Sequence, residues 1–284
     1  MKPLVSVLLP VYMTNPDFFS VSLKSIIEQD YENLEIVIAF DKSGNLEMDR
    51  KIQNVIEEKS ADKRIKVFPK ISSGLVDNLN HGLAFCKGEY IARMDSDDIS
   101  SKKRIGIQME YMQENNIDIC GTWAYILVDD IIVGKTSPPF SQKNIRSNIM
   151  LHNPLLHASL LIKKSVFEQI GQYNKNFSGA EDYEFYTRAI WRGISIANVP
   201  QYLVYLRETP GSIMHDSKTW KKTRKAYIKT KINAVKNYGM HGVKDIFYAA
   251  LSPISYFIPP SLALKTKSSI GWYSEVSPFS VVPD

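Results

Sequence analysis

The sequence predicts an α/β protein built on a mainly parallel central sheet with helices on both of its faces. Short apolar segments alternate with segments of helical spacing over residues 4–95, which is the pattern of parallel strands joined by crossover helices. The chain has 284 residues, of which 44% are hydrophobic and 23% charged, as in ordinary globular proteins. Its net charge of +5 is small, so charge alone selects no class of partner.

The first half of the chain predicts four strands and three helices in alternation. Residues 4–12, LVSVLLPVY, form a nearly continuous apolar run, as expected for a strand that is covered on both faces. Pro10 should lie at the end of this strand because it has no N–H to donate. Helical spacing follows in residues 17–30, with Asp17 as the N-cap. Further strands are predicted at 34–40, 64–69 and 89–95, and further helices at 48–60 and 75–86.

The second half predicts that the sheet becomes mixed. Residues 118–135 have the pattern of a hairpin whose turn lies near Asp129–Asp130, so antiparallel pairing is expected there. A helix is predicted at 179–193, with acidic residues in its first turn where they suit the helix dipole. The remaining predicted strands are 158–162 and 196–207.

The cysteines and the N-terminus bear on the cellular compartment. Cys86 and Cys120 have neither metal-ligand spacing nor the spacing of a disulfide framework. No small-residue cleavage site follows the first apolar segment, which we interpret as a buried strand rather than a signal peptide. Reduced thiols without an export signal indicate a cytoplasmic protein.

A basic segment precedes an apolar one near the C-terminus. Residues 217–244 contain nine Lys or Arg and no Asp or Glu, and apolar residues recur at helical spacing within them. Residues 245–265 are apolar and aromatic but are interrupted by Pro253, Pro259 and Pro260, which argues against a spanning helix. Together they favour contact with a membrane surface. A solvated helix docked on the domain and a nucleic-acid-binding helix are the alternatives.

Polar groups follow three of the predicted parallel strands. Tyr12 ends the first, Asp41 ends the second, and the DSDD cluster at 95–98 ends the fourth. Because ligands bind at the carboxyl ends of parallel strands, we expect these groups to share one site. Clustered carboxylates are hard oxygen ligands that suit Mg²⁺ or Mn²⁺. An acidic turn that caps the next helix is the alternative.

Four segments in this order resemble family 2 glycosyltransferases with the GT-A fold: VSVLLPVY, LEIVIAFDKSG, GEYIARMDSDD and GAEDYEFYTR. The resemblance covers residues 3–212 and is closest to bacterial enzymes that assemble exopolysaccharide, capsule or O-antigen repeat units. It implies a catalytic domain at 1–212, with a nucleotide-binding half at 1–98 and an acceptor half at 99–212. A basic, amphipathic helical extension at 213–284 would then contact the inner face of the cytoplasmic membrane.

The resemblance implies inverting transfer of a hexose from a UDP-sugar to a hydroxyl of a lipid-linked saccharide, with Mn²⁺ or Mg²⁺ as cofactor and no nucleic acid. Asp182 would be the base that removes the hydroxyl proton. Asp97, Asp95 and Asp98 would hold the metal. Contacts to the donor sugar or acceptor would come from Glu181, His157 and Arg207. The nucleotide would be contacted by Pro10, Tyr12, Asp41, Asn80, Arg93, Asp95, Ser96 and Asp97.

The chain departs from the family pattern at Met13, Phe40 and Lys42, which surround the expected nucleoside contacts. Two other classes of function fit the sequence less well. A nicotinamide-dependent oxidoreductase would need G-x-G-x-x-G after the first strand, where the sequence reads PVYMTNP. A non-catalytic sugar-nucleotide or nucleic-acid-binding protein would not need the base, whereas Asp182 is present. No QxxRW motif is found, so processive polymer synthesis is not expected.

Overall fold

The computed structural model describes residues 2–71, 74–209, 217–259, 262 and 272–280. Within them, ten strands form one sheet whose main path runs β10-β7-β6-β8-β4-β1-β2-β3. Its N-terminal half is parallel: β1 (Val5–Val11) pairs with β2 (Leu34–Lys42) and β4 (Tyr90–Arg93), and β2 pairs with β3 (Ile65–Ile71). The predicted α/β class with a mainly parallel sheet is confirmed.

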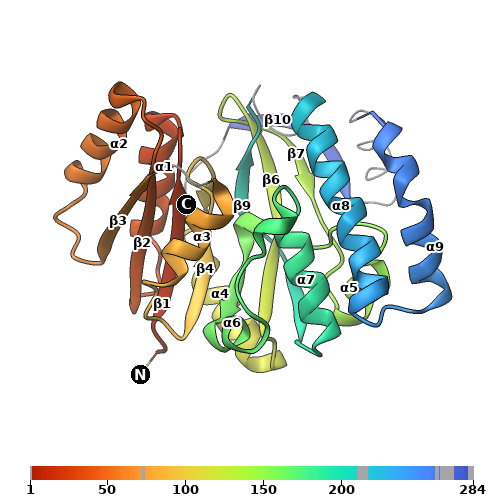
Figure 1. Cartoon of the computed structure of the whole chain (residues 1–284). Coiled ribbons are helices and arrows are strands. Elements are labelled where there is room, and N and C mark those ends of the chain that lie inside the picture. The colour runs from red at the N-terminus through yellow and green to blue at the C-terminus, as the bar shows by residue number, and fades with distance from the viewer. Residues whose placement is uncertain (1, 72–73, 210–216, 260–261, 263–271, 281–284) are drawn as a thin grey trace.

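Helices cover both faces of this half because alternate residues of β1 point to opposite sides. Val7 and Leu9 pack with residues of α1 (Pro16–Ile27), α2 (Leu46–Glu58) and α4 (Arg104–Asn115). Leu8 packs in the other apolar cluster with α3 (Leu75–Leu83) and α7 (Glu181–Trp191). Figure 1 shows this half, coloured red to yellow, beside the later strands.

The second half is mixed, as the sequence predicted. Strands β6 (Ile119–Val128) and β7 (Ile131–Thr136) form a hairpin, and its two turn residues Asp129 and Asp130 have φ of 49° and 62°. Positive φ at both central residues matches the right-handed twist of hairpin strands. Strand β8 (Leu161–Lys163) is antiparallel to β4 and β6, β9 (Ile196–Arg207) is parallel to β6, and β5 (Ile99–Ser100) is antiparallel to β9.

Some local predictions differ from the structure. The cap of α1 is Asn15, whose side chain accepts from the Asp17 N–H at 2.8 Å, so Asp17 lies inside the first turn behind Pro16. Proline suits that position because its missing N–H has no helical partner there. Of the predicted strand 158–162, the first part is the 3₁₀ turn η1 (His157–Ser159) and only β8 is extended. The short helices are α5 (Gln142–Asn148), α6 (Lys164–Ile170) and the 3₁₀ turn η2 (Lys175–Phe177).

The C-terminal extension was predicted to be helical, but its described end is a strand. Helices α8 (Ser217–Asn237) and α9 (Val243–Leu251) and the 3₁₀ segment η3 (Ser252–Phe257) come first, and α8 runs beside α7 (Figure 1). Strand β10 (Tyr273–Ser280) then pairs with the edge strand β7. Pro278 is tolerated in β10 because an edge strand does not need every N–H. The predicted boundary at 212/213 lies outside the described residues.

No helix in the described ranges combines the length and the apolar character needed to cross a membrane.

Candidate active site

A cavity of about 230 Å³ opens where β1 and β2 end and where the chain leaves β4. Parallel pairing aligns these ends, because Pro10 pairs with Ala39 on β2 and Leu8 pairs with Arg93 on β4. The lining therefore combines residues that are distant in the sequence. These are Pro10, Tyr12, Thr14, Asp41, Gly74, Leu75, Asn78, Asp95, Ser96 and Asp97.

The structure brings together most of the nucleotide contacts that the sequence predicted, namely Pro10, Tyr12, Asp41, Asp95, Ser96 and Asp97. Asp41 is fully buried, whereas 46% of Tyr12 is exposed. The Ser96 and Thr14 hydroxyls lie 2.5 Å apart, which joins the loop after β1 to the acidic turn. An exposed ring near a buried carboxylate can hold a flat base that also donates hydrogen bonds.

Helix α3 contributes lining residues that the sequence analysis missed. Its N-cap Gly74 has φ of +83°, a conformation that favours glycine. Asn78 is buried and donates to the Ala39 carbonyl at 3.0 Å, which fixes the helix to the end of β2. The predicted Asn80 instead bonds the backbone of Tyr173 at 2.8 and 3.1 Å. Asn78 and Asn80 point in different directions because residues two apart in a helix do not share a face.

Arg93 does not line the cavity, although it was predicted to contact the nucleotide. Its side chain is 2% exposed and pairs with Asp95 through both terminal nitrogens, at 2.6 and 2.5 Å. Such a two-pronged pair fixes a carboxylate more firmly than a single bond does. Arg104 in turn donates to the Arg93 carbonyl at 2.8 Å. Arg93 therefore acts on the cavity through the orientation of Asp95.

The three carboxylates of the acidic turn have different surroundings. Asp98 is buried, and its Oδ1 accepts from the Arg207 backbone N–H at 2.8 Å. Burial, together with the charges of Asp95 and Asp97, raises the pKa of Asp98 well above its ordinary value. Burial and the charge of Asp95 raise the pKa of Asp97 to about 6. The one N–H from Arg207 thus does not offset burial and repulsion at Asp98, and only Asp95 has a cationic side chain bonded to its carboxylate.

The three carboxylates of the predicted metal set differ in their protein partners. No group of three His, Cys, Asp or Glu side chains in the described part of the chain is arranged to hold a metal ion. Asp95 is occupied by Arg93 and Asp98 by the main chain of Arg207. Asp97 lines the cavity, and no donor from the other described residues contacts its carboxylate. Carboxylate oxygens are ligands that divalent cations prefer, so Asp97 is the residue of the turn that would hold one.

Arg207 lies against the acidic turn and outside the cavity lining. Its Nε donates to the Asp97 carbonyl at 3.0 Å, and Nη1 pairs with Asp130 at 2.5 Å. The guanidinium carbon also lies 4.1 Å from the centre of the Phe18 ring. In the structure Arg207 therefore holds the turn, and its contact with donor or acceptor stays a prediction.

Asp182 lies in the first turn of α7 and is partly exposed. Its Oδ1 accepts from the Tyr183 N–H and its Oδ2 from the Asn153 amide, both at 2.7 Å. Burial and the neighbouring charge of Glu181 raise the pKa of Asp182 to about 6. A carboxylate whose pKa is near the working pH is suited to accept a proton.

Arg93 connects the cavity with Asp182 electrostatically. Its charge lowers the pKa of both Asp97 and Asp182. Asp182 and Asp95 also each raise the pKa of the Tyr173 phenol. Asp182 and the acidic turn therefore both lie within electrostatic range of Arg93.

The structure holds Glu181 and His157 through protein groups. Glu181 is buried, and its Oε2 accepts from the Gly179 N–H at 2.6 Å. His157 Nε2 lies 3.0 Å from the Tyr173 hydroxyl. Burial and the charge of Arg93 lower the pKa of His157 well below its ordinary value, so the ring is neutral at physiological pH. Neither residue belongs to the cavity lining, and their contact with donor sugar or acceptor stays a prediction.

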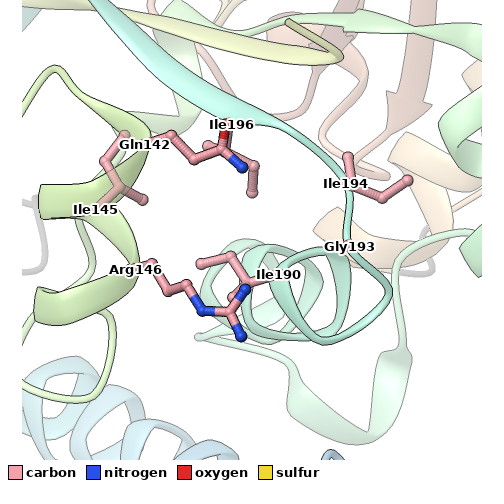
Figure 2. Close-up of a pocket in the computed structure, with 7 residues that line it drawn as sticks. All are labelled: Gln142, Ile145, Arg146, Ile190, Gly193, Ile194 and Ile196. Atoms are coloured by element: carbon pink, nitrogen blue, oxygen red, sulfur yellow. The ribbon is translucent and has the colours of Figure 1, made fainter.

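A smaller hollow of about 40 Å³ lies between α5, α7 and β9 (Figure 2). Its walls are mostly isoleucine side chains, with Gln142 and Arg146 at its α5 side. It has no carboxylate and has room for about one water molecule. The cavity at the strand ends is the candidate site because residues of the acidic turn line it.

Similar sequences agree with this interpretation. The family model described as glycosyl transferase family 2 matches residues 6–171. An uncharacterized glycosyltransferase of Haemophilus influenzae is 31% identical over 250 residues, which cover 82% of this chain and 76% of that protein. The O-antigen biosynthesis glycosyltransferase WbnJ of Escherichia coli is 27% identical over 187 residues, covering 66% of this chain and 72% of that protein.

Similar folds are found among solved structures. TarS 1–349 of S. aureus in complex with UDP-GlcNAc has a TM-score of 0.65 at 18% identity, over 93% of this chain and 75% of that chain. The mannosyltransferase PcManGT from Pyrobaculum calidifontis, in complex with GDP-Man and Mn²⁺, has a TM-score of 0.62 at 14% identity, over 95% of this chain and 81% of that chain. At these identities the likeness is one of fold.

Proposed function

The chain belongs to glycosyl transferase family 2 and is a glycosyltransferase with the GT-A fold, and from this premise we propose the reaction that it catalyses. It moves a hexose from a UDP-sugar to a hydroxyl of a lipid-linked saccharide, with inversion and with a divalent cation. Residues 1–98 form the nucleotide-binding half and 99–212 the acceptor half of its catalytic domain. The observation that carries the proposal is the cavity at the strand ends, which the acidic turn lines. The charge of Arg93 lowers the pKa both of Asp97 in this turn and of Asp182.

The nucleoside binds between Tyr12 and Asp41 in this proposal. The exposed ring of Tyr12 stacks on the base, since every base offers a flat face. Asp41 accepts from the N–H of uracil, and the buried carboxylate makes that contact selective. The neighbours of similar fold were solved with UDP-GlcNAc and GDP-Man, so UDP and GDP are the first nucleotides to compare.

The acidic turn receives the rest of the donor. Asp95, held by Arg93, uses its remaining lone pairs for the ribose hydroxyls. Asp97 would hold Mn²⁺ or Mg²⁺. When bound, the ion supplies positive charge that stabilises the departing diphosphate. Asp98 keeps the turn in shape through the Arg207 N–H.

Asp182 acts as the general base. The acceptor oxygen forms a bond to the anomeric carbon as the bond from that carbon to the diphosphate oxygen breaks. The hydroxyl proton moves to the Asp182 carboxylate, and the electron pair of the broken bond leaves with UDP. Attack from the side opposite the leaving group inverts the configuration, through an oxocarbenium-like transition state. No enzyme nucleophile is needed.

The acceptor is lipid-linked in this proposal because the C-terminal extension suits a membrane surface. Val243 and Phe257 are 87% and 82% exposed, and Phe247, Leu251 and Ile254 of α9 and η3 are exposed as well. Lys225 on the basic helix α8 lies 5.6 Å from the ring of Tyr256 in η3. Apolar side chains near cationic ones favour anionic lipid, at about 1 kcal/mol per basic residue near the surface. That a relative is named for O-antigen biosynthesis supports such an acceptor.

A thermal-shift panel tests the donor site. UDP, GDP, dTDP and CMP are each added with and without Mn²⁺. A ligand at about a hundred times its dissociation constant stabilises the folded state by about 2.7 kcal/mol. We expect UDP with Mn²⁺ to give the largest shift and UDP alone a smaller one. No shift with any nucleotide, or equal shifts with and without the metal, would contradict the proposed donor site.

A further inference from the structure

Asn153 lies in the loop between α5 and η1 and contacts the proposed base. Its Nδ2 donates to Asp182 Oδ2 at 2.7 Å and lies 3.4 Å from the Tyr227 hydroxyl oxygen. Its Oδ1 accepts from the Leu155 N–H at 3.4 Å. Because an ionised carboxylate only accepts, the NH₂ end of the amide must face Asp182. The two hydrogens of that NH₂ group thus have one acceptor each.

Tyr227 brings the C-terminal extension to this point. Its ring stacks on that of Tyr183, with centroids 4.8 Å apart and planes at 23°. Tyr183 follows Asp182 in α7 and donates its backbone N–H to the same carboxylate. Helix α8 packs along α7 and buries Ala226 and Thr230. The helix that the sequence linked to membranes therefore also reaches the catalytic carboxylate.

We propose that Asn153 and Tyr227 are positioning residues for glycosyl transfer. Asn153 holds the carboxylate of Asp182 in one orientation and favours its ionised form, and Tyr227 orients the Asn153 amide. Both act through Asp182 and not on the substrate. The inference rests on the proposed function, in which Asp182 is the base.

The groups around Asp182 shift its pKa in opposite directions. Burial and Glu181 raise it, while the Tyr183 N–H, the Asn153 amide and the Arg93 charge lower it, and the result is about 6. The other titratable groups that face it are phenols which burial keeps uncharged: Tyr173, Tyr183, Tyr186 and Tyr227. Among the described side chains, Asn153 alone donates to this carboxylate. Removing the Asn153 amide should therefore raise the pKa of Asp182.

The test is the pH profile of the Asn153→Leu variant, which keeps the side-chain size and removes both donors. UDP release is followed with UDP-glucose, UDP-galactose or UDP-GlcNAc, whichever is turned over fastest, with Mn²⁺ and water as acceptor. The acid limb of kcat/KM should move upward by about one to two pH units, because a hydrogen bond to a charged group is lost. The same change at Asn148, whose amide bonds only to its own helix turn, should leave the limb in place.

Tyr227→Phe gives a second, milder perturbation. It keeps the stack on Tyr183 and removes only the hydroxyl, so a smaller shift in the same direction is expected. Tyr248→Phe on α9 is its control. An acid limb that stays in place while Asn153→Leu loses activity equally at every pH would overturn the inference. Full turnover by Asp182→Asn would instead overturn the base on which it rests, so the two failures are distinguishable.

Urea unfolding measures the same contact without a substrate. The wild type, Asn153→Leu, Asp182→Asn and the double variant form a double-mutant cycle. Coupling between the two residues is expected at about pH 8, where the carboxylate is ionised, and should shrink at about pH 5, below the pKa of about 6. Coupling that is absent, or equal at both pH values, would contradict the inference.

Discussion

Replacing Arg93 with methionine should destabilise the protein strongly. The Arg93 side chain is 2% exposed, and both of its terminal nitrogens donate to the carboxylate of Asp95, whose side chain is 38% exposed. Breaking a buried ion pair by removing one partner costs about 3–5 kcal/mol. Because water reaches Asp95 and screens part of the loss, the lower end of about 3 kcal/mol is expected. For a domain of this size that lowers Tm by about 6 °C or somewhat more.

Differential scanning calorimetry and urea unfolding measure this loss. The double variant Arg93→Met/Asp95→Leu should recover most of the stability, because an apolar pair of similar volume no longer leaves a charge unpaired. Lys51→Met is the matched control: it removes the cation of an exposed pair with Glu47 and should leave Tm unchanged. If Arg93→Met were within about 2 °C of the wild type, Asp95 would not depend on Arg93 and the reasoning would be refuted.

Three further predictions concern the nucleotide, the metal and the membrane. Tyr12→Ala should weaken UDP binding by about 5- to 150-fold if the ring stacks on the base, and unchanged affinity by calorimetry would exclude stacking. Asp97→Asn should abolish the effect of Mn²⁺ on UDP binding, and in the wild type that effect should fade as pH drops through about 6, where Asp97 takes up a proton; a metal effect that survives in Asp97→Asn would contradict this. The double variant Phe247→Ser/Phe257→Ser should lose flotation with phosphatidylglycerol vesicles, whereas Leu46→Ser, at a residue 84% exposed on α2, should retain it; equal flotation of all three would place the contact elsewhere.

Much of the fold and the candidate site could be predicted because strand ends are local features. Apolar runs mark β1, β2 and β4, and parallel pairing then brings the residues after them together. Pro10, Tyr12, Asp41 and the acidic turn needed no other information to be placed at one cavity. The hairpin turn at Asp129–Asp130 could also be predicted from its own residues, because Asp suits the positive φ values that the turn requires.

The partners of charged side chains could not be predicted from local pattern. Arg93 and Arg207 looked like ligand contacts, yet the fold gives them Asp95 and Asp130 as partners. For the same reason the sequence does not distinguish the three carboxylates of the predicted metal set, although Asp95 and Asp98 accept hydrogen bonds from protein groups and Asp97 faces the cavity. Strand β10 was missed because its pairing with β7 joins segments that are far apart in the sequence.

Helix α8 shows how one segment can have two roles. Its lysines and periodic apolar residues predicted a basic amphipathic helix, and the structure agrees. Its contact with the Asn153–Asp182 pair through Tyr227 depends on how the chain returns across α7. A pattern of charge and hydropathy contains no signal for such a contact, which only the packing reveals.

The central claim is that Asp182 is the base of a glycosyl transfer, and one paired measurement on Asp182→Asn tests it most directly. Stabilisation by UDP with Mn²⁺ is measured beside UDP release from the best UDP-hexose. The account predicts wild-type nucleotide binding together with a loss of turnover of about 10²- to 10⁴-fold. Wild-type turnover by Asp182→Asn would contradict the account, because no other described residue is assigned to take the acceptor proton.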